Sequence, residues 1–575
     1  MSEERFPAAS GAPDPAPASG RDQLEFEAVF FSREELWLTP GDLGRFQLQR
    51  GRDMAAEAGP FQPLILTIGA LENRLLAELP RPEIEDLSHR FLLYDLAGPL
   101  LEQIRPPRAE AADEVRMRAG LARDLGDGLG RLKLAGLTWD QVAALPPSGL
   151  ARVLAEQGRR HDAFLQSRGR QDRAGGRRRL LDDLSAGRPF KTLAGVRRIV
   201  YRQARRLSPF ETEFLLALAA QVRVEVLLKV PAWVREEKTG PGAGFDLLRA
   251  IRRLEGSAAP ALDLELDGPG PSPPALAYAA DVLLSPEAGR GGAAPPDPAG
   301  RIKIVRTPTA YHEVEEAARR LKKLVVAGTA PEDLALVVPS LADYGPLVED
   351  LGRRFGLAFH FRRGRTLAEE GPARAILNLA GIWDSHWERA RILDLIRSPY
   401  FQGPSGPVDP GGLALAAGVT DQRAGGGFEE NLAKFIRRER DEERAGSAQA
   451  LLAWVERLKE AGRALAGART WSDFFLVFGG LLTELGWPGP PPPDPGLAEA
   501  EAEAARRVSG ELARLTAALA RPPAPPAGLD QFRFWLETVL AEHHIPDGRA
   551  PDGRIWVLNY YDLHGGLFEE IFFLG

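Results

Sequence analysis

Apolar and polar positions follow two different periods along this chain, and the period changes several times. Val222, Val224 and Val226 alternate with charged residues, which is the two-residue period of a half-buried strand. Over 311–327 the apolar residues instead recur every three or four positions, which predicts a helix that ends at Gly328. Further buried strands are predicted from the short apolar runs at 333–338, 554–558 and 571–574.

The first half of the chain predicts an α/β domain over 24–255. Strands are predicted at 24–31 and 63–66, and Thr67 is placed to cap the helix that follows the second strand. From about 80 to 185 the pattern is helical throughout, which predicts a helical insert. Strand and helix then alternate again, with strands at 195–201 and 222–230 and a helix at 211–220.

The second half predicts a similar domain over 301–575. Strands are predicted at 301–305 and 357–361, with helices at 311–327 and 344–355, and a second helical insert is predicted at about 373–550. Alternation of strands with helices favours parallel sheets. The predicted fold class is therefore α/β, with two parallel-sheet domains that each carry a large helical insertion. Outside the domains, Pro, Gly and Ala predict a disordered tail at 1–23 and a linker at 256–300.

Composition excludes several classes of protein. The formal net charge of −7 over 575 residues argues against a uniformly basic nucleic-acid binder, so any DNA contact must come from local patches. The chain has no cysteine, which rules out disulfides and cysteine-held zinc or iron–sulfur centres within it. No run approaches the roughly 18 apolar residues of a membrane span. These features predict a cytoplasmic protein that does not enter a membrane.

Two basic runs are candidates for DNA contact. The first, over 168–179, includes Arg173, Arg177 and Arg178, and the second, over 197–206, includes Arg202 and Arg205. Such residues bind phosphates without sequence preference and lose affinity as salt rises. The alternative is a solvated helix face on which nearby acids such as Asp182 and Asp183 balance the arginines. Trp383 and Trp387, one turn apart, could stack on bases, but a core role is favoured.

Five stretches carry a resemblance to one family. In order and spacing they resemble segments of the AddB/RecC-like subunits of bacterial helicase–nucleases, which have a UvrD-like superfamily 1 helicase fold and belong to the PD-(D/E)XK nuclease family. The stretches are PLILTIGALENRLL (63–76), RGRQDRAGGRRRLLDDL (168–184), VYRQARRLSPFETEFLLAL (200–218), the segment 301–361, and IWVLNYYDLHGGLFEEIFFLG (555–575).

The resemblance implies two RecA-like (P-loop NTPase-like) domains, DNA as a ligand and an ATPase partner of the AddA/RecB type. It also implies a nuclease domain beyond residue 575 and a role in double-strand break repair. Thr67 matches a threonine that lies near bound DNA in active relatives, although a helix cap is the favoured role. His564 and Gly566 lie in an element that resembles Lys-Gly-Leu-Glu, where Gly565 and Phe568 replace its charged residues.

The residues that ATP hydrolysis needs are missing from the sequence. A phosphate loop of the form GxxxxGK[ST] requires a Gly-Lys pair, and the chain contains none. Tyr201 and Arg202 occupy the position of the acidic pair that would hold magnesium, and Pro339 occupies that of an arginine. The acidic turn at Pro331-Glu332-Asp333 has no acidic-x-Lys strand behind it, as a nuclease would need, and His312 and His360 lack ligand spacing. We therefore predict no catalytic, nucleotide-binding or metal-binding residue, and no cofactor, in this chain; ATP and Mg²⁺ would belong to a partner.

Three functions remain open from the sequence. The favoured one is a catalytically inert, helicase-like scaffold that holds DNA beside an ATPase subunit. The second is an active ATP-dependent helicase whose amino terminus is incomplete. The third is a protein-interaction scaffold that does not bind DNA.

Overall fold

The computed structural model describes most of the chain in sixteen stretches. They are residues 31–39, 62–104, 111–146, 148–204, 207–229, 243–257, 261–267, 303–362, 365–383, 387–419, 427–489, 495–521, 524–545, 552–560, 562–563 and 568–575. The predicted tail, most of the strand predicted at 24–31, and the candidate residues Arg205, His564 and Gly566 lie outside them. The α/β class is confirmed, because many helices accompany two sheets with parallel strands.

The chain divides into two compact units. One comprises Met1–Pro82, Ala174–His360 and Ala550–Gly575, and the other comprises Glu83–Arg173 and Phe361–Arg549. Both sheets named below belong to the first unit, whereas the second unit is almost entirely helical. In the described stretches, no helix has the length and apolar character needed to cross a membrane.

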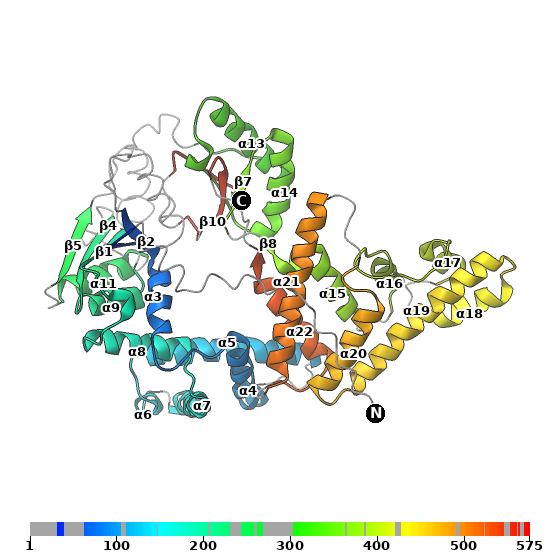
Figure 1. The fold of residues 1–575 in the computed structure, drawn as a ribbon, viewed down its shortest axis with the longest axis horizontal. Helices are drawn as coiled ribbons and strands as arrows, with labels where there is room; N and C mark the ends of the chain where they lie inside the picture. The colour runs from blue at the N-terminus through cyan, green and yellow to red at the C-terminus, as the bar shows by residue number, and fades with distance from the viewer. Residues whose placement is uncertain are drawn as a thin grey trace. The chain divides into compact units, whose positions relative to one another are not determined.

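The larger sheet has five parallel strands in the order β2-β1-β3-β4-β5 (Figure 1). Its core is formed by residues such as Leu38, Ile199 and Val224, none of which is exposed. The strands are β1 (Phe31–Thr39), β2 (Gln62–Thr67), β3 (Arg198–Ala204), β4 (Arg223–Lys229) and β5 (Leu262–Asp267).

Helices pack their apolar faces on this sheet. Thr67 and Ser208 begin two of them, and each side-chain oxygen accepts a backbone N–H of the first turn, as helix caps do. At Ser208 the side chain of Glu211 completes a capping box, with Pro209 in the first turn. The helices of this region are α3 (Ile68–Ala77), α8 (Arg173–Ser185), α9 (Pro209–Leu218) and α11 (Ala243–Glu255).

Two strands of this sheet differ from the sequence-based expectation. β1 extends from residue 31 to 39, beyond the strand predicted at 24–31, because Leu36 and Leu38 are buried while Glu35 and Trp37 on the other face are partly exposed. β5 lies within the predicted linker at 256–300. There Leu262 and its alternate neighbours pack on the core while Asp263 is exposed, which is the pattern of an edge strand. Nearby prolines and glycines obscured this short alternation in the sequence.

The smaller sheet has four strands in the order β11-β6-β10-β7. β6 is buried along its whole length and is parallel to both β10 and β11. The elements are α13 (Ala310–Val326), β6 (Leu334–Val338), α14 (Leu341–Phe355), β7 (Phe359–Phe361), β10 (Ile555–Asn559) and β11 (Glu570–Phe573), all close to their predicted positions.

The strand predicted at 301–305 is wrong over the part that the structure describes. Residues 303–307 form no strand, and the side chain of Ile304 is 91% exposed. A strand needs a hydrogen-bonded neighbour, and in the described stretches no strand pairs with this segment. The alternating letters of RIKIV were therefore not sufficient evidence of a strand.

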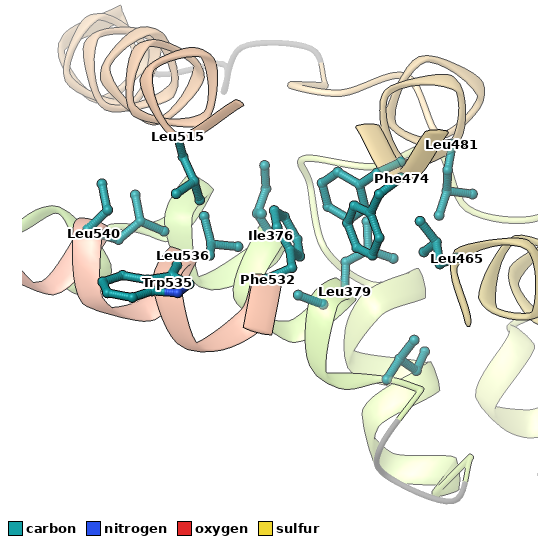
Figure 2. Packing of buried hydrophobic residues seen from close by; sticks show 14 of the residues in the cluster. Ile376, Leu379, Leu465, Phe474, Leu481, Leu515, Phe532, Trp535, Leu536 and Leu540 are labelled. Atoms are coloured by element: carbon teal, nitrogen blue, oxygen red, sulfur yellow. The ribbon is translucent and has the colours of Figure 1, made fainter. Parts of the chain in front are cut away.

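The second unit joins both predicted helical inserts around one apolar core. Phe91 of the first insert packs edge-on against Trp535 of the second, with 4.8 Å between ring centroids. The hydroxyl of Tyr94 hydrogen-bonds Oε1 of Gln531 at 3.1 Å, and Arg90 pairs with Glu542. Figure 2 shows the part of this core where aromatic and aliphatic side chains of the second insert converge.

The helices of this unit come from two parts of the chain. The first insert contributes α4 (Asp86–Ile104), α5 (Ala111–Leu134), α6 (Trp139–Ala143) and α7 (Ser148–Ser167). The second contributes α15 (Gly371–Gly381), α16 (Arg389–Ile396), α17 (Pro410–Ala416), α18 (Phe428–Arg438), α19 (Glu442–Gly467), α20 (Trp471–Glu484), α21 (Pro495–Leu519) and α22 (Leu529–Glu542). A short antiparallel pair, β8 (Arg365–Thr366) and β9 (His544–Ile545), closes the second insert.

Candidate functional site at the carboxyl edges of the sheets

The strand order of the five-stranded sheet marks one position as a candidate ligand site. In open parallel sheets, ligands bind beyond the carboxyl ends of the strands, where the strand order reverses. The order β2-β1-β3-β4-β5 places that point between β1 and β3. Trp37 and Thr39 end β1, Thr67 ends β2, and Arg202 lies near the end of β3.

Arg202 lies against an aromatic ring at this edge. Its guanidinium carbon is 4.0 Å from the ring centroid of Trp37, whose indole N–H donates to Oε1 of Glu35 at 2.6 Å. The Nε atom of Arg202 is buried and has no hydrogen-bond partner in the described part of the chain. A planar cation stacked on an indole is suited to phosphate or to the face of a base.

No carboxylate ends β1, β2, β3 or β4, whereas the edge strand β5 ends in Asp267. The last three residues of β1 to β4 are Trp-Leu-Thr, Ile-Leu-Thr, Arg-Gln-Ala and Leu-Leu-Lys. Glu225 lies in the middle of β4, where it pairs with Arg198 and with Arg223. Tyr201 is fully buried, and burial raises the pKa of its hydroxyl well above the usual value. The carboxyl ends of these strands therefore offer no acidic pair for magnesium.

The smaller sheet has a polar carboxyl edge of a different kind. Glu313, in the first turn of α13, accepts hydrogen bonds from the Tyr344 hydroxyl at 2.9 Å and from the backbone N–H of Gly575 at 2.8 Å. Burial, and then the hydrogen bond to Glu313, raise the pKa of Tyr344. Pro339 follows β6 directly, and Ser340 then caps α14. The position after β6 thus offers no arginine.

Thr67 acts as a helix cap in this structure. Its hydroxyl oxygen accepts the backbone N–H of Ala70 at 3.1 Å, in agreement with the role favoured from the sequence. This contact satisfies one of the free N–H groups at the start of α3. Nothing in the geometry of Thr67 indicates a DNA contact in addition.

The first basic run is extensively ion-paired. Arg177 donates two hydrogen bonds to the carboxylate of Glu72, at 2.8 and 2.9 Å, and its guanidinium lies over the ring of Phe210. Arg178 pairs with Asp182 at 2.9 Å. Arg173 lies 3.7 Å from Glu83. These pairs favour the alternative reading of the run, in which acids balance the arginines of a helix face.

The two tryptophans considered as base-stacking residues belong to the helical core. Trp383 packs against that core and donates its indole N–H to the carbonyl of Leu458 at 2.9 Å. Trp387 also packs against it, with Nζ of Lys459 5.1 Å from the ring centroid. The sequence favoured a core role for at least one of them, and the structure shows both packed against the core and partly buried.

A buried polar cluster in the helical unit escaped sequence reasoning. The Nε2 atoms of His89 on α4 and His161 on α7 are 2.9 Å apart. Lys133 of α5 lies 3.0 Å from Asp172, 2.5 Å from Asp162 and 3.2 Å from Nδ1 of His161. These residues are separated by up to 83 positions, since 172 − 89 = 83, so no local motif relates them.

The surroundings of this cluster keep His89 neutral and Asp162 charged. Burial, followed by the neighbouring ring of His161, lowers the pKa of His89 to about 4. Burial opposes charge on Asp162, but hydrogen bonds from His161 and Lys133 outweigh it and lower the pKa of that carboxyl to about 2. The cluster therefore combines a neutral imidazole with an ionised carboxylate at pH 7.

Comparison with known proteins adds no family to these observations. No protein-family model matches the chain, and no curated protein matches it significantly. The functional reading therefore depends on the residues and their geometry.

Proposed function

We propose that this chain is an ATPase-inactive, helicase-like scaffold subunit of a helicase–nuclease that acts in DNA double-strand break repair in the cytoplasm. In this proposal the two sheet-containing regions are RecA-like domains that have lost nucleotide chemistry. DNA, as a single strand or a duplex end, is the ligand. ATP and Mg²⁺ are bound by an AddA/RecB-like helicase subunit that assembles with this chain.

One observation carries the proposal. At the strand-order reversal of the five-stranded sheet, the inner strands end without a carboxylate, and Arg202 stacks on Trp37 instead. An ATPase needs an acidic residue near this place to hold Mg²⁺, whereas a cation on an aromatic ring suits a phosphate backbone. The order of the five segments that resemble AddB/RecC-like subunits gives the helicase context.

A second candidate is an interaction scaffold that does not bind DNA. Arg177 and Arg178 are occupied by Glu72 and Asp182, so the run that contains them offers less positive charge than its sequence implies. Ion pairing of this kind weakens attraction to phosphate. This candidate predicts that the purified chain ignores DNA even at low salt.

Titration of the full chain with a fluorescent ATP analogue and Mg²⁺ tests the proposal that this chain has lost nucleotide binding and hydrolysis. We expect no saturable binding and no ATP hydrolysis, because the described carboxyl ends of β1 to β4 provide no carboxylate to hold the metal–nucleotide complex. An active superfamily 1 helicase measured alongside serves as the positive control. Saturable binding or DNA-stimulated hydrolysis by this chain would instead support the active-helicase alternative.

A further inference from the structure

The buried cluster in the helical unit places three ligand-type atoms around one point. A nitrogen of His89, a nitrogen of His161 and a carboxylate oxygen of Asp172 all lie within 4.8 Å of one another. His161 is 1% exposed and Asp172 is 4% exposed, while His89 is half-buried. Two imidazoles and one carboxylate form a ligand set that binds divalent transition metals.

The carboxylate of Asp162, which lies beside the ring of His161, also suits a metal site. Oδ1 of Asp162 lies 3.4 Å from Nδ1 of His161, whereas Nε2 is the ring nitrogen that faces His89. Asp162 is itself held by the indole N–H of Trp139 at 2.7 Å and by Lys133. A carboxylate in this position fixes the tautomer of a ligating histidine, with the proton on Nδ1 and the lone pair on Nε2.

We propose that His89, His161 and Asp172 form a binding site for one divalent transition-metal ion, for which Zn²⁺ is the probe. Zinc–ligand bonds of about 2.0–2.1 Å place tetrahedral ligands about 3.3 Å apart. The two Nε2 atoms, now 2.9 Å apart, need to separate by only a few tenths of an ångström. Water supplies the fourth ligand, as it does in zinc sites with three protein ligands.

Lys133 does not prevent this arrangement. An ionised carboxylate has about four lone-pair sites on its two oxygens, so Asp172 can keep its contact with Lys133 and still ligate a metal. Two carboxylates, those of Asp162 and Asp172, surround the single lysine of this cluster. A divalent cation is therefore attracted to the site rather than repelled.

A metal-free explanation of the same contacts exists and makes a different prediction. Lys133 can donate to Nδ1 of His161, which leaves Nε2–H to donate to Nε2 of His89. That tautomer satisfies both rings without an ion, but it leaves Nδ1 with no proton to give to Asp162. The two explanations differ in whether Zn²⁺ binds here in a one-to-one ratio.

The site would act as a structural clip. His89 lies on α4, His161 on α7, and Asp172 immediately before α8, so one ion would join three segments of the first helical insert. Metal bound only to the folded state stabilises that state by mass action. This role is independent of the proposed DNA function, so either can fail without the other.

Calorimetric titration of the metal-free full chain with Zn²⁺ tests the site. We expect one ion per chain with a submicromolar dissociation constant, together with a rise in the melting temperature. Binding should be lost in His89→Ala. In Asp162→Asn it should weaken by about 10–100-fold, because the support of His161 is removed. Co²⁺ in place of Zn²⁺ should give the visible absorption of a tetrahedral ion.

The exposed His312 on α13 provides a matched control, and His312→Ala should bind Zn²⁺ as the wild type does. Melting of each metal-free variant shows whether it is folded. The absence of stoichiometric binding by the wild type would overturn the proposal whatever the variants do. Undiminished binding by a folded His89→Ala variant would also overturn it, because the ion would then lie elsewhere.

Discussion

Replacing Phe532 by alanine is expected to lower the free energy of unfolding of the helical unit by about 3–5 kcal/mol. Phe532 on α22 is fully buried and lies beside Phe474 of α20 (Figure 2). Its ring centroid is 4.9 Å from that of Phe474 and 4.8 Å from that of Phe478, also on α20. Truncation removes these contacts and leaves a cavity between two long helices, which close packing cannot easily refill. Urea unfolding followed by circular dichroism measures the effect.

Leu476 provides the control for Phe532, because it lies on α20, the helix that carries Phe474 and Phe478, but is 66% exposed. Leu476→Ala should change the free energy of unfolding by less than about 0.5 kcal/mol. A loss below about 1 kcal/mol for Phe532→Ala would contradict the packing seen between α20 and α22.

The second large effect is expected at Arg177. Arg177→Ala should lower the free energy of unfolding of the sheet-containing unit by about 2–3 kcal/mol, because it removes two charge-assisted hydrogen bonds from Glu72. Glu72 is only 4% exposed, so water cannot fully replace the arginine. The stacking of Arg177 over Phe210 is lost as well. Chemical denaturation of the full chain provides the measurement.

The neighbouring Arg178 provides the control, because it is a surface arginine whereas Arg177 holds a buried carboxylate. It pairs with Asp182 one turn away, and both side chains are exposed, so Arg178→Ala should cost less than about 0.5 kcal/mol. Equal losses for the two variants would mean that the buried carboxylate of Glu72 does not depend on Arg177. A folded Arg178→Ala variant also isolates any contribution of this helix face to DNA affinity.

Local sequence patterns predicted most individual elements, because periodicity and capping act over a few residues. Thr67 was correctly predicted as a cap, and the helix at 311–327 ends as Gly328 indicated. The exceptions are segments in which hydrogen-bonded pairing with another strand, rather than the local alternation of residues, decides whether a strand forms. The segment 303–305 alternates but has no neighbouring strand among the residues that the structure describes, whereas β5 is stabilised by its pairing with β4 despite its Pro-rich surroundings.

The contacts that form the candidate sites join residues far apart in the chain, so local sequence patterns could not predict them. Glu72 and Arg177 are 105 positions apart, so the neutralisation of this arginine could not be read from its neighbours. The same holds for His89 and His161, which are 72 positions apart. The two helical inserts were predicted as separate features, but Trp535 and Phe91 show that they share one core. In contrast, the absence of a motif is visible in the sequence alone, and the prediction that nucleotide chemistry is lost rests on it.

Titration of the full chain with a fluorescent forked DNA, at low and high salt and with and without ATP, tests the central claim most directly. We predict binding that weakens steeply as salt rises, since phosphate contacts release counterions, and that is the same with and without ATP. Absence of binding at low salt would contradict the DNA-holding role, and affinity that shifts with ATP would contradict the loss of nucleotide binding.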